Sequence, residues 1–359
     1  MLRSLVGSEM CIRDRTGIIL SIIQEEEKMM KISKLFMTLP EAYACTPDGM
    51  EIDRYGNLIL SCPNYADEHM SGCVLRITKD RRVEKWFDVP VHPETGVARN
   101  MGIAFDSNWN IYLCDNQGWS ERPELLYKGR VLKCEVDDAG NIKKTTVIAD
   151  HMEHPNGIRI RGEYMYVTQS YLHPVKDPSG KLVSCVYRFH LDEHDIDITN
   201  TLEDPHILTT FITQNPECQY GADGIAFDSA GNLYVGNFGD GEVWKLVLNQ
   251  DGSLKEKRLF AKNPEELKST DGMVFDENGN LYIADFCANA IVKVTKDGYV
   301  SRLAQSPDCD GLDGGLDQPG EPIIYDGKIV ASCFDLVTGP GKVNTAHEMP
   351  ATLAEVDIS

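Results

Sequence analysis

One short sequence phrase occurs six times in this chain, and it constrains the fold more than any other feature. Two of its clearest copies are ADGIAFDSAGNLYVGN (222–237) and TDGMVFDENGNLYIAD (270–285). Each copy has a polar residue, a turn, a short apolar run, a second turn of the D-x-x-G-N type and another apolar run. Two apolar runs joined by such a turn are typical of a β-hairpin. The chain is therefore predicted to be built from repeated hairpins.

The spacing of the copies indicates how the hairpins are arranged. The motif glycines of the first five copies lie 53, 55, 67 and 48 residues apart, at Gly49, Gly102, Gly157, Gly224 and Gly272. Pro322 takes the place of the sixth glycine, 50 residues further on. A period of about fifty residues, made of short strands, is typical of a β-propeller with one blade per repeat. We therefore predict an all-β, six-bladed propeller with four antiparallel strands in each blade.

The last blade needs a strand from the other end of the chain. After the sixth hairpin, the segment ATLAEVDI (351–358) offers only a third strand. The segment KISKLFMTL (31–39) precedes the first blade and offers the fourth. Such a strand would close the ring and cover two exposed sheet edges. We expect residues 30–359 to form this single propeller domain.

Residues 1–29 are set apart from the domain. The segment MLRSLVGSEMCIRDR (1–15) resembles the translation of a sequencing adapter, so the natural start is expected at Met29 or Met30. Residues 1–29 are therefore predicted to be a non-native or disordered extension. The apolar run 17–23 is shorter than the roughly 18 residues of a membrane span. It also lacks a small-residue cleavage site, which argues against a signal peptide.

Charge and cysteine usage exclude several classes of partner. The formal net charge is −21, so neither nucleic acid nor a membrane surface is an expected partner. The 11 cysteines include no C-x-x-C pair, and several lie inside apolar runs, where thiols act as small hydrophobes. This usage predicts a reducing, cytoplasmic location.

The residues that lead the first strand of each repeat are the candidate functional residues. The innermost strand of a propeller blade begins at the central channel, so these side chains are expected to meet there. In chain order they are Asp48, Asn100, Asn156, Asp223, Asp271 and Glu321. Asp and Asn before Gly are also ordinary turn formers, and this alternative accounts for part of the pattern. It does not account for Glu321, which precedes a proline.

These six side chains offer only carboxylate and amide oxygens. A set without thiolate or imidazole favours a hard cation, and calcium takes about 6–8 such oxygens. Acids held together without a cation would repel one another. The sequence therefore predicts one divalent cation in the channel, with Ca²⁺ as the first expectation and Zn²⁺, Mn²⁺ or Mg²⁺ as alternatives.

The motif series resembles that of the family of senescence-marker protein (regucalcin), gluconolactonase and squid-type phosphotriesterase. The matching segments are RNMGIAFD (99–106), PNGIRI (155–160), ADGIAFDSAGNLYVGNFGDGEVWKL (222–246) and GEPIIYDGKIVASCFD (320–335). The resemblance implies a six-bladed propeller with one metal ion, held by Glu321, Asn156, Asp223 and Asn100. The family's glutamate comes from its first blade, so this chain would be circularly shifted.

The same resemblance implies further roles. Asp223 is expected to act as general base as well as metal ligand, and Asp48 competes with Glu321 as the acidic ligand. The residues expected to contact substrate are Arg99, Asn100, Asp271 and Asp48. The acidic, glycine-rich loop 307–320 lacks the residue order of a known calcium loop, and we expect it to connect into the last blade, with a second ion as the alternative.

The predicted function is that of a calcium-dependent, gluconolactonase-like hydrolase. It would open a sugar lactone or another lactone by polarising the carbonyl and by water attack assisted by Asp223. The expected partner is a small-molecule lactone or ester, and the oligomeric state is left open. The alternatives are a phosphotriesterase-like hydrolase, a lyase or synthase of related propellers, and a non-catalytic ligand-binding propeller.

Overall fold

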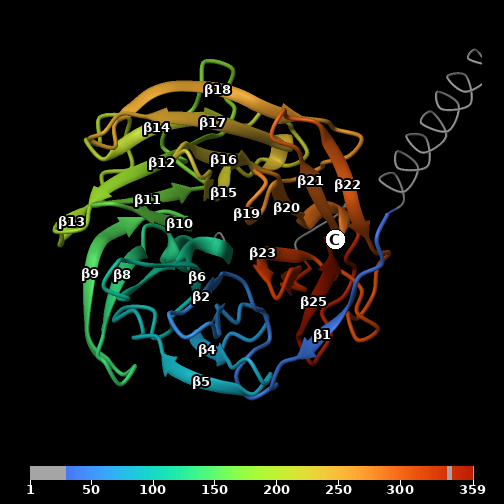
Figure 1. The fold of residues 1–359 in the computed structure, drawn as a ribbon. Helices are drawn as coiled ribbons and strands as arrows, with labels where there is room; N and C mark the ends of the chain where they lie inside the picture. Colours follow the sequence, from blue (N-terminus) through green and yellow to red (C-terminus); the bar gives the residue numbers. More distant parts are fainter. Residues whose placement is uncertain (1–29, 121, 338–341, 359) are drawn as a thin grey trace, which may run out of the picture.

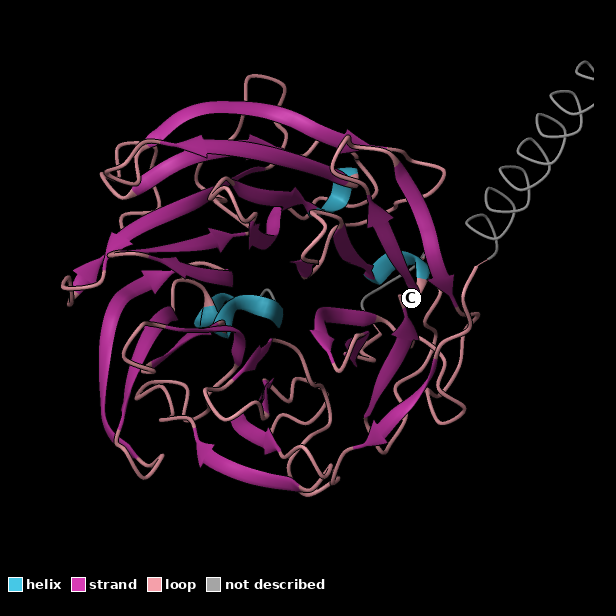
Figure 2. Ribbon diagram, viewed as in Figure 1, coloured by secondary structure: helices cyan, strands magenta, loops and turns pink. Residues whose placement is uncertain are grey.

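The strands of this protein form six sheets around a central axis (Figure 1). The computed structural model describes residues 30–120, 122–337 and 342–358, so the extension predicted for residues 1–29 lies outside the described residues. Figure 2 shows strands and loops around the whole ring, with a few short 3-10 helices near its inner side. The predicted all-β, six-bladed propeller is confirmed.

Each of the first three blades adds its strands in chain order from the channel outward. Blade 1 comprises β2 (Met50–Ile52), β3 (Leu58–Cys62), β4 (Cys73–Ile77) and β5 (Val83–Asp88). Blade 2 comprises β6 (Asn100–Phe105), β7 (Ile111–Asp115), β8 (Gly129–Val136) and β9 (Ile142–Met152). Blade 3 comprises β10 (Pro155–Arg161), β11 (Tyr164–Gln169), β12 (Val183–His190) and β14 (Ile207–Ile212).

Blades 4 and 5 repeat this order, and blade 6 takes its outer strand from the start of the domain. Blade 4 comprises β15 (Ala222–Phe227), β16 (Leu233–Asn237), β17 (Glu242–Leu248) and β18 (Leu254–Lys262). Blade 5 comprises β19 (Met273–Phe275), β20 (Leu281–Asp285), β21 (Ala290–Val294) and β22 (Val300–Gln305). Blade 6 comprises β23 (Pro319–Tyr325), β24 (Lys328–Cys333), β25 (Thr352–Asp357) and β1 (Lys34–Thr38).

The ring closes through the pairing of β1 with β25. These strands run antiparallel, with Lys34 opposite Glu355 and Thr38 opposite Thr352. In Figure 1 the blue β1 lies beside the red β25. The predicted closure by an N-terminal strand is therefore confirmed.

Blade 2 departs from the four-strand prediction. A two-residue strand, β13 (Ile196–Asp197), lies in the connection between β12 and β14 of blade 3. It pairs in parallel with the outer strand β9, with Ile196 opposite Ala149. This connection covers part of the outer edge of blade 2, which reduces its exposed hydrogen-bonding edge.

The D-x-x-G-N turns have the same geometry in successive blades. In blade 4 the backbone N–H of Asn232 donates to Asp228 Oδ1 at 2.8 Å, and Gly231 has a φ of +83°. In blade 5 Asn280 donates to Asp276 in the same way at 2.8 Å. The aspartate thus holds the turn, and the left-handed position favours glycine. This requirement explains why the phrase recurs in the sequence.

The motif glycines allow adjacent innermost strands to approach closely. A Cβ on Gly224 of blade 4 would lie 1.9 Å from the carbonyl oxygen of Asp271 in blade 5. A Cβ on Gly157 of blade 3 would similarly lie 2.6 Å from the carbonyl oxygen of Asp223 in blade 4. Real Cβ atoms do not approach other atoms so closely, so these positions require glycine. The hydrophobic core then lies between the faces of neighbouring blades.

The described part of the chain offers no helix for a membrane span, because its helices are 3-10 turns too short to cross a bilayer.

Candidate active site in the central channel

Three aspartates from three blades interact at the inner ends of the first strands. Asp48 precedes β2, Asp223 is the second residue of β15, and Asp271 precedes β19. Asp48 and Asp223 are 5% and 3% exposed. Burial, followed by the charge of Glu321, raises the pKa of Asp48 to about 7. Burial and the neighbouring carboxylates raise the pKa values of Asp223 and Asp271 well above the usual range.

Few donors compensate these three carboxylates. The backbone N–H of Gly272 donates to Asp271 Oδ1 at 2.9 Å. The backbone of Gly49 likewise donates to the carboxylate of Asp48. Within the described residues, no hydrogen bond is made to the carboxylate of Asp223, and no Lys or Arg forms an ion pair with any of the three aspartates. Buried acids in this state require either protons or a cation. The oxygen-only chemistry of this set suits a hard divalent cation. In the described residues, however, these oxygens do not form a group within 4.8 Å of one another, as those of Asp317, Asp335 and Glu348 do.

Asn156 of β10 adds a neutral oxygen to this set. It is 5% exposed, and its Nδ2 donates to the hydroxyl of Tyr220 at 3.0 Å. The same hydroxyl lies 2.6 Å from Nε2 of His154. The contact of Nδ2 orients the amide, so that Oδ1 faces away from Tyr220 and can serve as a ligand.

Glu321 reaches the channel, but its carboxylate forms an ion pair with Arg159. Its Oε1 accepts a hydrogen bond from Arg159 Nη2, and the two side chains are 13% and 18% exposed. Burial raises the pKa of Glu321 to about 7, and Arg159 offsets part of this effect. A Cβ on Gly272 would lie 2.2 Å from Glu321 Oε2, so the Glu321 side chain lies against blade 5. Unlike the three aspartates, Glu321 has a permanent countercharge.

Strand register shows that Asn100 does not occupy the position in blade 2 that Asp223 occupies in blade 4. In blade 4, Ala222 pairs with Asn237 and a bulge follows, so Asp223 takes the leading position. In blade 2 the equivalent pair is Asn100 with Asp115. The leading position therefore belongs to Met101, which is apolar. The sequence R-N-M-G contains one residue more between the polar residue and the glycine than A-D-G does.

A similar shift applies to blade 6. Pro319 pairs with Cys333 before the bulge, so Gly320 takes the leading position and Glu321 takes that of the motif glycine. The packing agrees, because a Cβ on Gly320 would lie 2.9 Å from Asp48 Oδ1. The absence of a side chain at Gly320 thus leaves room for the carboxylate of Asp48. The expectation that all six leading residues are oxygen donors was wrong at these two positions.

The structure does not place Asn100 with the channel aspartates. Its Nδ2 donates to Ser61 Oγ at 2.6 Å and to the carbonyl oxygen of Cys73 at 3.0 Å. The hydroxyl of Ser61 in turn donates to the Asn100 carbonyl oxygen at 2.7 Å. Asn100 is fully buried between blades 1 and 2. Its position therefore indicates a structural role and does not support metal ligation.

Arg99 is also occupied elsewhere. Its Nη1 donates to the carbonyl oxygens of Pro63, Asn64 and Met70 at 2.9, 2.8 and 2.6 Å. Its Nη2 makes longer contacts with two further carbonyls in the same loop. The side chain is buried and holds the loop 63–70 in place. This placement does not support the predicted contact with substrate.

An aromatic collar at the channel mouth was not predicted. We define it by Phe238, Phe286 and Phe334, which directly follow β16, β20 and β24. Their ring centroids lie 5.8 Å apart in each successive pair, and all three are at most 5% exposed. Met101 belongs to the same buried cluster. A recurring phenylalanine after the second apolar run (GNFGD, ADFCA and SCFD) was the available sequence signal.

The collar lies at the same end of the channel as the aspartates. The backbone N–H of Phe238 donates to the Gly221 carbonyl oxygen at 2.9 Å, two residues before Asp223. An apolar collar lowers the local dielectric constant and strengthens electrostatic interactions beside it. The site thus combines buried carboxylates with an apolar mouth.

Comparison with known families agrees with this architecture. Residues 241–310, which extend from the outer part of blade 4 through blade 5, match the family model described as SMP-30/Gluconolactonase/LRE-like region. This match agrees, over these residues, with the resemblance found in the sequence. No curated protein sequence matches the chain.

Solved structures with the same fold have different activities. A calcium-binding regucalcin from Agrobacterium tumefaciens has 11% identity and a TM-score of 0.57, with 91% of this chain and 94% of that chain covered. A gluconolactonase from Xanthomonas campestris has 16% identity and a TM-score of 0.53, with coverage of 90% and 94%. A virginiamycin B lyase from Staphylococcus aureus has 12% identity and a TM-score of 0.52, with coverage of 91% and 100%. The fold alone therefore does not decide the reaction.

Proposed function

We propose that this protein is a divalent-cation-dependent hydrolase of the gluconolactonase type, which opens a lactone at the channel mouth. The observation that carries this proposal is the set of three interacting aspartates without a paired Lys or Arg: Asp48 and Asp223 are buried, and Asp271 is half-buried. A propeller used only as a scaffold has no need for such a set, since buried acids destabilise the fold unless a ligand neutralises them. The family segment and the structural similarity to a gluconolactonase support the choice of reaction.

The three aspartates and Asn156 would hold the cation. Their oxygen-only chemistry suits Ca²⁺. We choose Asp48 over Glu321 as the acidic ligand because Arg159 already neutralises Glu321. A divalent cation bound there would polarise the lactone carbonyl and stabilise the developing negative charge.

Asp223 is the proposed general base. Burial raises the pKa of Asp223 in the cation-free protein. A bound cation would keep this carboxylate ionised and so able to accept a proton. In the proposed reaction Asp223 accepts a proton from water as the water oxygen bonds to the carbonyl carbon. The ring C–O bond then breaks, and the same proton passes to the leaving alkoxide oxygen. The product is a hydroxy acid, and Asp223 returns to its starting state.

The surroundings favour a neutral substrate. The chain carries a formal net charge of −21, which repels anions. The collar residues Phe238, Phe286 and Phe334 are buried and make the surroundings of the carboxylates apolar. A neutral lactone meets both conditions, whereas its hydroxy-acid product is an anion that the same charges would repel.

The test is hydrolysis of a panel of neutral lactones and phosphotriesters by Asp223→Asn. We expect the variant to lose lactone hydrolysis by about 100-fold or more, because proton transfer typically contributes about 10²–10⁴-fold. The matched control is Glu217→Gln, an exposed residue of the preceding connection, which should keep wild-type activity. Circular dichroism checks that both variants are folded. Wild-type kcat/KM in Asp223→Asn, or turnover of phosphotriesters alone, would refute the proposal.

A further inference from the structure

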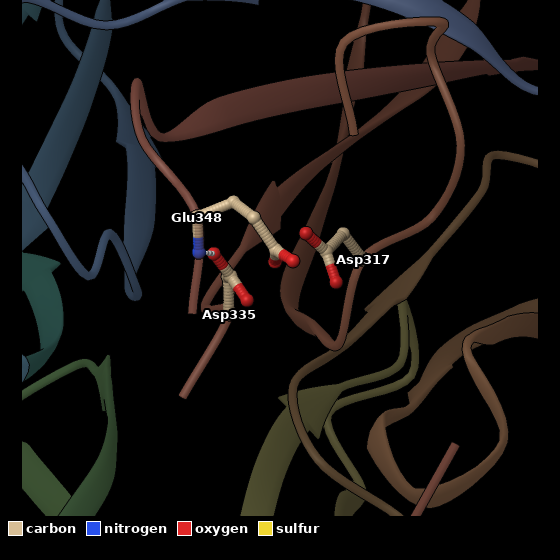
Figure 3. A group of neighbouring side chains, drawn as sticks. All are labelled: Asp317, Asp335 and Glu348. Atoms are coloured by element: carbon tan, nitrogen blue, oxygen red, sulfur yellow. Dashed lines mark hydrogen bonds between the residues drawn. The ribbon is translucent and has the colours of Figure 1, made fainter. Parts of the chain in front are cut away.

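A second acidic cluster lies outside the set of channel aspartates, on blade 6 (Figure 3). Asp317 lies two residues before β23, Asp335 lies two residues after β24, and Glu348 belongs to the connection that leads to β25. One oxygen from each side chain lies within 4.8 Å of the others. Oxygens that share one calcium ion at about 2.3–2.6 Å are at most about 5 Å apart, so this spacing fits a single ion.

The cluster contains buried oxygens that lack a hydrogen-bond partner in the described residues. Asp317 is 1% exposed, and its Oδ1 has no donor. The Oε2 atom of Glu348 is also buried and has no donor in the described residues. Figure 3 shows the carboxylates of Asp317 and Glu348 directed toward one another. Two acceptors that face each other without a donor destabilise a fold, which points to a positive ligand between them.

The neighbouring residues supply little positive charge. His347 Nδ1 lies 3.2 Å from Asp335 Oδ2, and it is the single basic group paired with the cluster in the described chain. The other contacts of Asp335 are neutral: Asn344 Nδ2 donates to Oδ1 at 3.0 Å, and the backbone N–H of Glu348 donates to Oδ2 at 2.7 Å. Three carboxylates therefore face one imidazole.

Asn344 borders the cluster through its amide nitrogen, which donates to Asp335 Oδ1. It is 3% exposed, and its Oδ1 is also buried without a donor in the described residues. The three carboxylates offer the oxygen ligands that calcium prefers. Soft metals are disfavoured because the set contains no thiolate.

We propose that Asp317, Asp335 and Glu348 form a calcium site on blade 6, distinct from the set of channel aspartates. The ion joins the beginning of β23 to the long connection between β24 and β25. That connection also carries Lys342, whose Nζ lies 2.9 Å from Cys287 Sγ and 5.4 Å from the ring centroid of Phe238 in the collar. The site thus fixes a segment that reaches the channel mouth.

Calcium titration of chelator-stripped protein tests this site. The experiment uses the full chain with Asp223→Asn, so that the proposed channel site is removed and binding must come from elsewhere. Isothermal titration calorimetry with CaCl₂ should then show one bound ion. Adding Asp317→Asn should abolish this binding. Adding Asp313→Asn, which removes an exposed carboxylate of the same loop, should leave it intact.

The outcomes separate this site from the proposed function. If wild-type protein and Asp223→Asn both bind one ion, the blade 6 site is supported and the channel cation is not. If Asp223→Asn binds none, or if the variant that also carries Asp317→Asn still binds one, the blade 6 site is refuted.

A thermal measurement guards against misfolding. The parent for this measurement is Asp223→Asn, and the variant adds Asp317→Asn to it. In chelator the variant should be at least as stable as the parent, because it removes a buried negative charge without changing the shape of the side chain. Calcium should raise the Tm of the parent and leave that of the Asp317→Asn variant unchanged. An equal rise in both proteins would contradict the assignment.

Discussion

Arg159 of β10 and Glu321 of β23 form an ion pair that joins blades 3 and 6. These blades are opposite members of a six-membered ring, so the pair spans the central channel. Glu51 of β2 is a second acid that interacts with the guanidinium of Arg159. The pair therefore links three blades, and it removes Glu321 from the carboxylates that are available to a cation.

Replacing Arg159 should destabilise the ring strongly. Arg159→Met leaves Glu321 and Glu51 largely buried without a countercharge, and breaking such a pair from one side costs about 3–5 kcal/mol. Urea unfolding at pH 7 measures this loss of the free energy of unfolding. The control Arg161→Met, an exposed position two residues along β10, should cost less than about 1 kcal/mol. Equal effects of the two substitutions would contradict the assigned role.

The cation-free protein should become less stable as the pH rises from about 4 to 7. Burial raises the folded-state pKa values of Asp48 and Glu321 to about 7, from ordinary values of 3.8 and 4.5. The stability contributed by their protonated forms is fully present below the unfolded pKa values and is lost as the pH rises through the folded values. Unfolding in chelator at pH 5.5, 6.5 and 7.5 measures this slope.

Two comparisons assign that slope to the channel. Asp48→Asn removes one of the titrating groups, so its pH dependence should be weaker than that of the wild type. Calcium should raise the free energy of unfolding of the wild type most at pH 7.5, where the carboxylates are most charged. A slope that Asp48→Asn leaves unchanged would show that other groups are responsible.

Close packing of the innermost strands predicts a large effect of a single methyl group. Gly224→Ala would place its Cβ 1.9 Å from the Asp271 carbonyl oxygen, so blades 4 and 5 would have to separate. We expect a loss of more than about 3 kcal/mol in the free energy of unfolding. Gly162→Ala is the control, because its Cβ meets open space and only its φ of +59° opposes the change. This control should cost about 1 kcal/mol, and a similar cost for both would contradict the packing.

Cys287 should be more reactive than Cys309, and both thiols are partly exposed. The hydrogen bond from Cys218, together with Lys342, lowers the pKa of Cys287 to about 6, whereas burial raises that of Cys309 to about 11. Iodoacetamide at pH 7 should therefore alkylate Cys287 faster, as followed by mass spectrometry, because the thiolate is the nucleophile. Lys342→Gln should slow the reaction at Cys287 and leave Cys309 unchanged. Equal rates at the two cysteines in the wild type would refute this.

Most of the fold could be predicted because its rules are local. Turn aspartates and left-handed glycines recur in each hairpin, as in 228–232 and 276–280, and they give a visible period. The closing strand was also accessible, since the last blade lacked one strand and the segment before the first blade offered it. The short strand β13 could not be predicted, because it depends on contact between blades 2 and 3 rather than on its own sequence.

The site was predicted only in part. Asp48, Asn156, Asp223 and Asp271 occupy leading positions, as their motifs indicated. The role expected for Asn100 depended on register, because a shift of one residue places its side chain between blades 1 and 2. Glu321 does reach the channel, but its ion pair with Arg159 could not be predicted from the sequence. The sequence indicated only part of the cluster of Asp317, Asp335 and Glu348. Asp317 lies in the acidic loop 307–320, for which a second ion was the alternative, whereas Asp335 and Glu348 join it only in the folded chain.

The central claim is that Asp48, Asp223 and Asp271 hold the divalent cation on which lactone hydrolysis depends. Its most direct test is the rate of lactone hydrolysis by chelator-stripped wild-type protein, before and after addition of calcium, beside the same measurement on Asp48→Asn. The account predicts that stripping lowers the wild-type rate by about 100-fold or more, since the cation supplies several kcal/mol of transition-state stabilisation. Calcium should restore the wild type and leave Asp48→Asn inactive. Lactone hydrolysis at an unchanged rate after stripping would contradict the claim.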